Sequence, residues 1–589
     1  MGVRPGASFT EPTRNLCKRS LLRSSNSIIF EKSSQIKPGL LESTCPDSLR
    51  TRCNIVPQKA DLMTTNSQQL SLLGRKATQA RDWRTVEVCA NELLRLSAKD
   101  PEGYFFKGLV EKAAQHPNIA SEAFEKALSL DAARYDAAIE LASQYVISMR
   151  NAEAITLLRN YTETLSNSPR YLDMAGTIYT DIGLASLALP LYQKANDLQP
   201  DIDLFRGNLA ACSIFLGKIK DAREIYLSLL EKNPLHQRNH YQLSRLERAT
   251  NDDHIVQMKA VLDQTTLPPH RNIFIYYALA KELEDLEQWD ESFHFYKQAG
   301  DAATTVSNYD VSNDEALIQK IIDTCTAEWL ADRKMSSSLE RRDKSPIFVL
   351  GLPRTGTTLT ERILASHSCV ESIGETKYLE SIMRTLSGIP SVEKMTPEMI
   401  DALAPMDTTA IANGYLDAVG YLLGDKPLFV EKLPYNFLYI GFIVKAFPNA
   451  KIVRLKRNPM DSCFAIYKQP FTWAYKFSYN LDDLARYYLA HDKLFSHWRN
   501  LLGEQLIEVE YETLVNESEN ETRTLLDSLG LDFEDACLNF EQNETATTTA
   551  SSVQVREKIH ARSVLRWKRY ENQLTPLRTR LEAAGIRAE

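Results

Sequence analysis

The feature that most constrains the fold of this chain is a spacing of about 34 residues between similar stretches of sequence. Small and aromatic residues follow Pro169 at fixed offsets, and the stretch from Asp203 repeats part of the pattern. The repeated positions include Ala210, Ala222, Tyr226 and Pro234. A period of this length indicates that one supersecondary unit recurs, so it predicts stacked units rather than a single compact core.

The pattern resembles the tetratricopeptide repeat, a pair of packed helices. In the unit from Pro169, the matching residues are Gly176, Tyr179, Ala188, Tyr192, Ala195 and Pro200. Each pair has an apolar face that only its neighbours can bury, so we expect an α-solenoid. Units should begin near Ser67, Pro101, Tyr135, Pro169, Asp203, Gln237 and Ile273, with the unit at Gln237 degenerate. The resemblance implies a groove that binds a protein or peptide partner.

The period is lost after Ala302, which places a domain boundary downstream. One amphipathic helix is predicted from Asp314 to Leu330, and the stretch from Met335 to Pro346 has the composition of a linker. We therefore expect repeats over residues 67–304, a helix and linker over 305–344, and a second domain over 345–589.

The first residues of the chain differ in composition from the rest. Up to Lys59 there are ten basic and four acidic residues and no sustained helical period. We expect residues 1–62 to be a disordered or mis-annotated leader, with an organelle-targeting segment as the alternative. Met63 is then a candidate start.

Overall composition excludes several classes of function. A net charge of -8 argues against a nucleic-acid partner, and no apolar run approaches the ~18 residues of a transmembrane segment. Nine dispersed cysteines without a Cys-x-x-Cys pair indicate reduced thiols, a cytoplasmic location and no metal site.

A candidate anion-binding loop follows the predicted boundary. A strand-forming run, Ile347–Leu350, precedes Gly351 and Gly356, and a helix is predicted from Leu359 to Ser366. Free N–H groups at the start of such a helix hold phosphate oxygens. The glycine spacing is that of an ATP-binding loop, but Thr357 stands where that motif needs Lys, which argues against a kinase-like enzyme.

The loop Pro-Arg354-Thr-Gly-Thr-Thr358 resembles the 5'-phosphosulfate loop of sulfotransferases that use 3'-phosphoadenosine 5'-phosphosulfate (PAPS). It is most similar to the tyrosylprotein sulfotransferase branch and its tetratricopeptide-linked relatives. The resemblance covers about residues 347–577 and implies an α/β P-loop-type domain with a parallel sheet. It also implies that the donor is held by Arg354, Thr355, Gly356, Thr357 and Thr358.

A second motif resembles the family's site for the 3'-phosphate of the donor. A strand from Ile452 ends in Arg454, Lys456 and Arg457, and Asn-Pro follows. In the family, the Arg at the position of Arg457 and a Ser eight residues later bind this phosphate. The later position is Ala465 here, so Ser462 is the alternative hydroxyl.

Two further motifs imply the catalytic groups. Gly-Glu375-Thr resembles the segment whose Glu removes the proton of the acceptor hydroxyl, and Glu-Lys432-Leu-Pro resembles the segment whose Lys assists the leaving phosphate. Histidine is the base in other sulfotransferases, but His367, His491 and His497 lie outside that pattern.

Tyr511 resembles a family residue near the nucleotide, and Ser552 and Arg556 lie in a segment that resembles the one closing over the donor. We expect a PAPS-dependent transferase acting on a hydroxyl, such as a protein tyrosine, with a glycan, lipid or small alcohol as other acceptors. The alternative is a repeat scaffold with a degenerate nucleotide-binding domain.

Overall fold

The structure is a computed structural model of the full chain. It describes residues 66–332, 344–391, 393–471, 474–543, 545–549 and 551–588. The predicted leader over residues 1–62 and most of the predicted linker lie outside the described residues.

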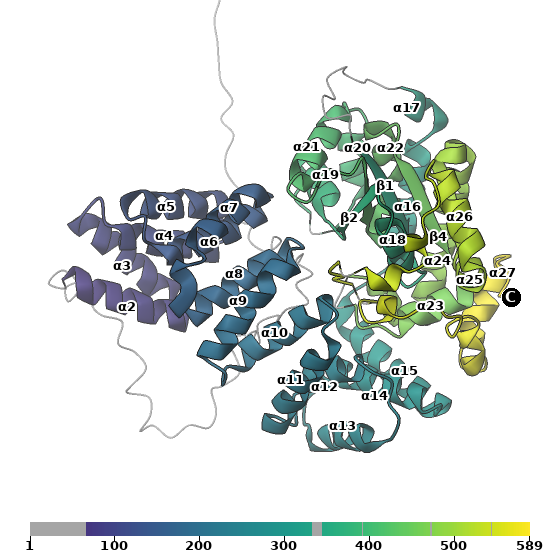
Figure 1. The fold of residues 1–589 in the computed structure, drawn as a ribbon, viewed down its shortest axis with the longest axis horizontal. Coiled ribbons are helices and arrows are strands. Elements are labelled where there is room, and N and C mark those ends of the chain that lie inside the picture. Colours follow the sequence, from purple (N-terminus) through teal and green to yellow (C-terminus); the bar gives the residue numbers. More distant parts are fainter. Residues whose placement is uncertain are drawn as a thin grey trace, which may run out of the picture.

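The repeat region consists of helix pairs, and the first helix of each pair begins at the residue where the period starts a unit. Figure 1 shows these pairs stacked side by side. In order along the chain, the pairs are α2 (Ser67–Ala80) with α3 (Trp83–Leu96), α4 (Pro101–Ala113) with α5 (Pro117–Leu130), α6 (Tyr135–Ile147) with α7 (Asn151–Tyr161), α8 (Pro169–Asp181) with α9 (Ala185–Leu198), α10 (Asp203–Phe215) with α11 (Ile219–Lys232), α12 (Gln237–Ser244) with α13 (Asp253–Gln264), and α14 (Ile273–Asp285) with α15 (Trp289–Ser307).

Close packing between the two helices of a pair explains the small and aromatic positions. A Cβ atom on Gly176 would lie 2.9 Å from the ring of Tyr192, which is itself fully buried. A larger residue at Gly176 would therefore push the two helices apart. In the degenerate unit that begins at Gln237, the first helix, α12, has only 8 residues. The short helix matches the weak repeat pattern in this part of the sequence.

The region after the repeats differs in detail from the prediction. Instead of one helix from Asp314 to Leu330, there are two, α16 (Val311–Thr324) and α17 (Ala327–Ala331). The break occurs at Cys325 and Thr326, because the Thr326 hydroxyl accepts a hydrogen bond from the Trp329 N–H at 3.2 Å and so caps a new helix. Pro346 belongs to the first strand rather than to a linker.

The C-terminal domain is built on a parallel five-stranded sheet with the order β2-β3-β1-β4-β5. Successive strand residues point to opposite faces, and each face has its own apolar core, with Phe348 on one side and Val349 on the other. The strands are β1 (Ser345–Gly351), β2 (Val370–Gly374), β3 (Leu428–Lys432), β4 (Lys451–Lys456) and β5 (Leu506–Glu510). The helices are α18 (Thr357–Ala365), α19 (Tyr378–Ser387), α20 (Pro397–Leu403), α21 (Thr409–Val419), α22 (Ile440–Ala446), α23 (Pro459–Tyr467), α24 (Leu481–Leu502), α25 (Tyr511–Asn516), α26 (Ser518–Ser528) and α27 (Thr575–Ala583). The predicted architecture, an α-solenoid followed by an α/β domain with a parallel sheet, is confirmed.

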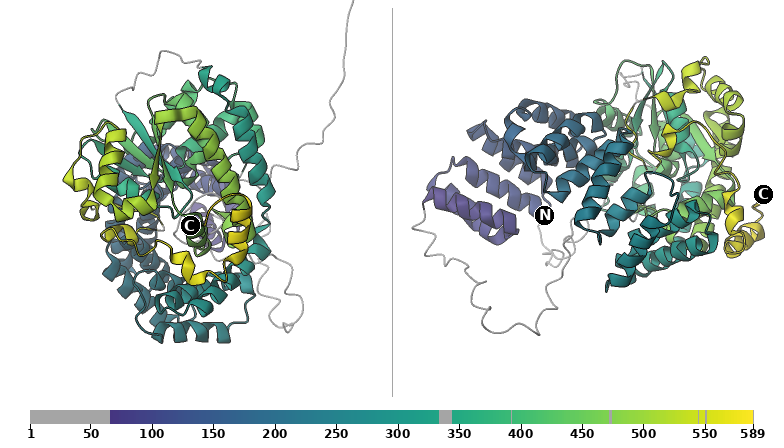
Figure 2. Two further views of the ribbon diagram at one scale, coloured as in Figure 1. Left: turned by 90° about the vertical axis from the view of Figure 1, so that its right-hand side faces the viewer. Right: turned by 60° about the horizontal axis from the view of Figure 1, so that its bottom comes forward.

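The solenoid runs beside and then beneath the C-terminal domain (Figures 1 and 2). Turns of the repeats contact the domain directly. The Tyr421 hydroxyl donates to the carbonyl of Ile182 at 2.8 Å, and Arg556 donates to the carbonyl of Phe215 at 2.9 Å. The last pair packs more extensively, with the Phe293 and Phe464 rings stacked at 6.4 Å. Among the described residues, no helix has the length and apolar character needed to cross a membrane.

Candidate functional site

The candidate site lies at the carboxyl ends of β1, β3 and β4, where the predicted loop joins β1 to α18. Gly351 and Gly356 have φ angles of 140° and 101°, which favour glycine. A Cβ atom on Gly356 would lie 2.7 Å from the ring of Tyr511, so this aromatic side chain packs directly on the loop. Tyr511, which was predicted to lie near the nucleotide, is therefore in contact with the loop.

The N-terminus of α18 opens onto this loop. Gly356 is its N-cap and offers no side chain to bind the first N–H groups of the helix. The Thr355 hydroxyl donates to the Leu352 carbonyl at 2.7 Å, and the Thr358 hydroxyl lies 3.4 Å from that of Thr549. Thr357 is buried at the first helical position. Together with the helix dipole, these N–H groups can hold an anion.

Arg354 lies within the loop with a positive φ of 66°. Its guanidinium donates to the Ser551 hydroxyl and to the Gln554 side-chain oxygen, and its buried Nε has no hydrogen-bond partner. Burial lowers the pKa of Arg354 to about 10, and the neighbouring charge of Arg457 adds to this effect. The pKa decreases because burial disfavours the charged form of the guanidinium.

Arg457 follows β4 and reaches the same loop. It donates to the Arg354 carbonyl at 2.8 Å and to the Ser563 carbonyl at 2.7 Å, and it stacks 4.8 Å from the centre of the Tyr511 ring. Its Nε is also buried without a hydrogen-bond partner. Among the described residues, neither Arg354 nor Arg457 forms an ion pair with a carboxylate.

The predicted 3'-phosphate hydroxyl makes a local contact. Ser462 is buried, and its hydroxyl lies 3.2 Å from the carbonyl oxygen of Arg457. Ala465, one turn further along α23, is half-buried. Ser462 is therefore next to the arginine that it was expected to assist.

Glu375 and Lys432 form a direct ion pair. Lys432 ends β3, and its side chain is 1% exposed, whereas that of Glu375, just after β2, is 27% exposed. A second carboxylate, that of Glu361 on α18, lies 3.7 Å from the Lys432 nitrogen. Burial raises the pKa of Glu361, although the Lys432 charge opposes this rise. The pair thus presents an accessible carboxylate backed by a buried cation.

Glu431 supports this pair from within the core, and the sequence analysis assigned no role to it. Its carboxylate accepts hydrogen bonds from the Thr376 hydroxyl and, at 2.6 Å, from the Tyr415 hydroxyl. Complete burial raises its pKa to about 7. A charged residue inside an apolar strand, next to Lys432, was the sequence signal that could have identified it.

Two further predicted residues, Ser552 and Arg556, lie in a segment that contacts the loop. Arg556 donates to the Phe215 carbonyl in the repeats and packs over Gly217. Ser552 is buried, and its neighbours Ser551 and Gln554 are residues that contact Arg354. The sequence motif did not single out these two neighbours.

The three histidines considered as alternatives make structural contacts. His367 is 2.9 Å from the Asp532 carbonyl, and His497 is 2.9 Å from the Cys325 carbonyl. His491 is buried with its ring 4.8 Å from that of Phe437. Within the described part of the chain, no group of three His, Cys, Asp or Glu residues is arranged to hold a metal ion.

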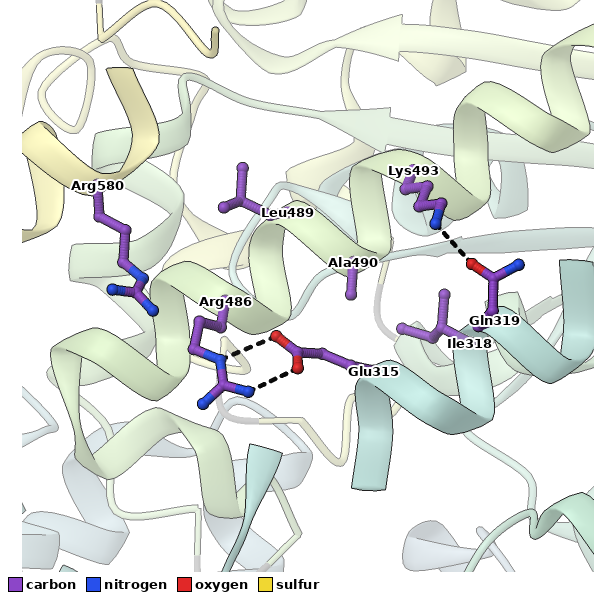
Figure 3. A pocket seen from close by; sticks show the side chains of 8 residues that line it. All are labelled: Glu315, Ile318, Gln319, Arg486, Leu489, Ala490, Lys493 and Arg580. Atoms are coloured by element: carbon purple, nitrogen blue, oxygen red, sulfur yellow. Dashed lines mark hydrogen bonds and ion pairs between the residues drawn. The ribbon is translucent and has the colours of Figure 1, made fainter. Parts of the chain in front are cut away.

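A separate cavity of about 410 Å³ lies between α16, α24 and α27 (Figure 3). Its charged side chains already bind each other or neighbouring groups. Arg486 forms two hydrogen bonds with Glu315, at 2.9 and 2.6 Å, and Arg580 pairs with Asp482 at 2.9 Å. The Arg486–Glu315 ion pair in this cavity therefore joins α16 to α24 of the C-terminal domain. The cavity offers no reactive group comparable to Glu375.

Comparisons with known proteins agree with this geometry. Residues 346–535 match the family model described as "Sulfotransferase family". An uncharacterized protein of Aquifex aeolicus is 32% identical over 369 residues, which cover 62% of this chain and 48% of that protein. Protein-tyrosine sulfotransferase 1 of Danio rerio is 27% identical over 211 residues, which cover 34% of this chain and 57% of that protein. The matched region thus spans about half the length of these relatives.

Solved structures with partial similarity fall into two groups. The sulfotransferase domain of the Synechococcus PCC 7002 olefin synthase has 20% identity and a TM-score of 0.29, covering 40% of this chain and 91% of its own. YrrB, a tetratricopeptide repeat protein, has 17% identity and a TM-score of 0.25, covering 35% of this chain and 96% of its own. The family match and the curated relatives confirm the predicted resemblance of the C-terminal domain to sulfotransferases.

Proposed function

We propose that this chain, whose residues 346–535 match the sulfotransferase family, transfers the sulfuryl group of PAPS to an acceptor hydroxyl. The observation that carries the proposal is the concentration of positive charge around the loop. Arg457 donates a hydrogen bond to the main-chain carbonyl of Arg354, and among the described residues neither side chain forms an ion pair with a carboxylate. PAPS has a 5'-phosphosulfate and a 3'-phosphate, which such groups bind well.

The donor would be held at two places. The N–H groups at the start of α18 and Arg354 would bind the 5'-phosphosulfate, together with the side chains of Thr355, Thr357 and Thr358. Arg457, with Ser462, would bind the 3'-phosphate, and Tyr511 would lie beside the nucleotide. Positioning and electrostatics then lower the barrier to in-line transfer.

The chemical step needs one base and one cation. The acceptor oxygen attacks sulfur, an O–S bond forms, and the bond between sulfur and the 5'-phosphate oxygen breaks. Glu375 would take the acceptor proton, and Lys432 would stabilise the negative charge on the leaving adenosine 3',5'-bisphosphate. The contact between Glu375 and Lys432 supports this division of roles, because it places base and cation side by side.

The proposed acceptor is a tyrosine in a protein or peptide. Relatives named protein-tyrosine sulfotransferases match the C-terminal domain, and the helical repeats offer a surface for a peptide partner. Glycans, lipids and small alcohols are the other acceptor classes to be screened.

Calorimetric titration of the full chain with adenosine 3',5'-bisphosphate tests the donor site, with ATP as the competing nucleotide. We expect tight binding of the bisphosphate only, and at least a tenfold weaker affinity in Arg457→Ala, because a charge-assisted phosphate contact is lost. Arg523→Ala on α26, where Arg523 pairs with Glu519 at 2.7 Å, is the matched surface control. Absence of bisphosphate binding, or equal binding of ATP, would leave a repeat scaffold as the better account.

Turnover then tests the catalytic groups. Glu375→Gln keeps an oxygen that can accept a hydrogen bond from Lys432 but removes the base. We expect kcat to fall by about 10² or more, with unchanged affinity for the bisphosphate. A variant with wild-type kcat would exclude Glu375 as the base.

A further inference from the structure

A buried carboxylate of the repeat region lies at the contact with the C-terminal domain. Glu284, near the end of α14, accepts hydrogen bonds from Lys468 at 2.8 and 3.0 Å and from Arg566 at 3.0 Å. The hydroxyls of Tyr296 and Tyr570 also donate to it, both at 3.2 Å. One repeat residue thus binds two cations of the catalytic domain.

These two cations flank the proposed 3'-phosphate site. Lys468 directly follows α23, the helix that begins just after Arg457. Arg566 lies three residues beyond Ser563, whose carbonyl accepts from Arg457 at 2.7 Å and whose hydroxyl is 2.6 Å from that of Tyr511. Glu284 is therefore linked to Arg457 by two routes, one through Lys468 and helix α23 and the other through Arg566 and the chain back to Ser563.

The segment of residues 563–567, which contains Ser563 and Arg566, also binds a carboxylate of the C-terminal domain. Asp461 on α23 accepts a hydrogen bond from the N–H of Leu565 at 2.5 Å and another from the N–H of Trp567 at 2.9 Å. Residues 563–567 are consequently clamped between Asp461 of the catalytic domain and Glu284 of the repeats. Because the Ser563 carbonyl accepts one of the two hydrogen bonds that hold Arg457, the position of this segment affects where the Arg457 guanidinium lies.

Loss of the Glu284 charge would change the position of residues 563–567. Glu284 is 7% exposed, and the side chains of Lys468 and Arg566 are 16% and 30% exposed. Without the Glu284 charge, these two partly buried cations would lose the carboxylate with which they pair. Such groups move toward water or toward another anion rather than remain in place. The movement would displace Ser563 and release one of the two hydrogen bonds that hold Arg457.

We propose that Glu284 of the repeat region is a positioning residue for the donor site, which fixes Arg457 through Lys468 and through the segment 563–567. This inference rests on the proposed function, because Arg457 is taken as the ligand of the 3'-phosphate. It makes the solenoid a structural part of the donor site as well as a surface for partners.

Glu284→Gln tests the inference through a difference between two ligands. Adenosine 3',5'-bisphosphate has the 3'-phosphate, and adenosine 5'-monophosphate lacks it. Calorimetry on the full chain should show a Kd for the bisphosphate raised about tenfold, with the Kd for the monophosphate changed less than twofold. If Glu284→Gln only destabilised the fold in general, the binding of both ligands would be weakened to the same extent.

Glu282→Gln is the matched control. Glu282 is a buried carboxylate on the same helix, but it faces the repeats, where it lies 2.6 Å from the Nδ1 of His254. We expect the Glu282→Gln variant to bind both ligands with the affinities of the wild type. In addition, Glu284→Gln should weaken bisphosphate binding less in the Arg457→Ala background, because both changes act on one contact.

Two results would overturn the inference, namely an unchanged bisphosphate Kd in Glu284→Gln or an equal loss for both ligands. Should Glu284→Gln not fold, as judged by circular dichroism, Arg566→Lys gives the same comparison with the carboxylate still in place. A wild-type chain that binds no bisphosphate would instead reject the proposed function before any variant is compared.

Discussion

Individual buried charges determine how the candidate site is held. Glu431 is fully buried, and its carboxylate binds the hydroxyls of Thr376 and Tyr415. Thr376 directly follows Glu375, and Glu431 directly precedes Lys432. One carboxylate in the core therefore ties Thr376, the residue after Glu375, to β3, the strand that ends in Lys432.

The protonation of Glu431 should make stability depend on pH. Burial raises its pKa from 4.5 to about 7, so between these values the folded chain binds a proton that the unfolded chain has lost. Stability contributed by this group is thus complete below pH 4.5 and decreases as the pH rises through about 7. The difference corresponds to about 3 kcal/mol.

Urea unfolding from pH 5 to 8 measures this effect. Glu431→Gln cannot titrate, so the free energy of unfolding of the wild type should fall relative to this variant as the pH increases. Glu519→Gln, the same substitution at a site on α26 that is 59% exposed, gives the background pH dependence. Parallel curves for wild type and Glu431→Gln would show that Glu431 is ionised throughout this range.

At the scale of elements, the loop from Gly351 to Gly356 depends on the strand and helix that it joins and on a third element. Tyr511 begins α25, directly after β5, and its ring covers Gly356. A left-handed φ and a close aromatic neighbour both require glycine at this position. The loop geometry is therefore completed by an element more than a hundred residues away in the sequence.

Gly356→Ala should combine backbone strain with a steric clash against Tyr511. We expect unfolding to become easier by about 2 kcal/mol or more, and affinity for adenosine 3',5'-bisphosphate to fall at least tenfold. Gly530→Ala is the control, since Gly530 also has a positive φ, 72°, but has open space around it. It should cost about 1 kcal/mol and leave ligand affinity unchanged. Equal affinities in the two variants would contradict the proposed role of the loop.

At the scale of the molecule, the last repeats and the C-terminal domain share one apolar core. Phe293 of α15 stacks on Phe464 and lies 6.1 Å from the ring of Tyr570. The first repeats have a separate core around Phe106. We therefore expect the chain to unfold in at least two cooperative parts, with the boundary inside the solenoid.

Two equivalent substitutions test this expectation by hydrogen exchange. Phe106→Ala and Phe293→Ala each remove a buried ring, at a local cost of about 3–5 kcal/mol. Phe106→Ala should increase exchange in the first repeats and leave bisphosphate affinity unchanged. Phe293→Ala should increase exchange in α23 and the C-terminal segment and weaken bisphosphate binding. Unchanged exchange in the C-terminal domain of Phe293→Ala would show that the two parts unfold independently.

The sequence by itself determined the features that depend on neighbouring residues. The repeat units begin where the period places them because helix pairs bury their faces against adjacent pairs. The loop after β1 was recognisable because strand, glycine pair and helix follow one another directly. The family's motifs likewise singled out Glu375, Lys432 and Arg457, which lie at the carboxyl ends of β2, β3 and β4.

Only the tertiary structure decided the contacts between distant segments. It brought Arg556 to the Phe215 carbonyl and Ser551 and Gln554 to Arg354, and it placed Glu284 of the repeats between Lys468 and Arg566. Such pairings join residues up to hundreds of positions apart, and no local period or motif encodes them. They depend on how the solenoid packs against the sheet domain, which is determined by the burial of surface from both parts at once.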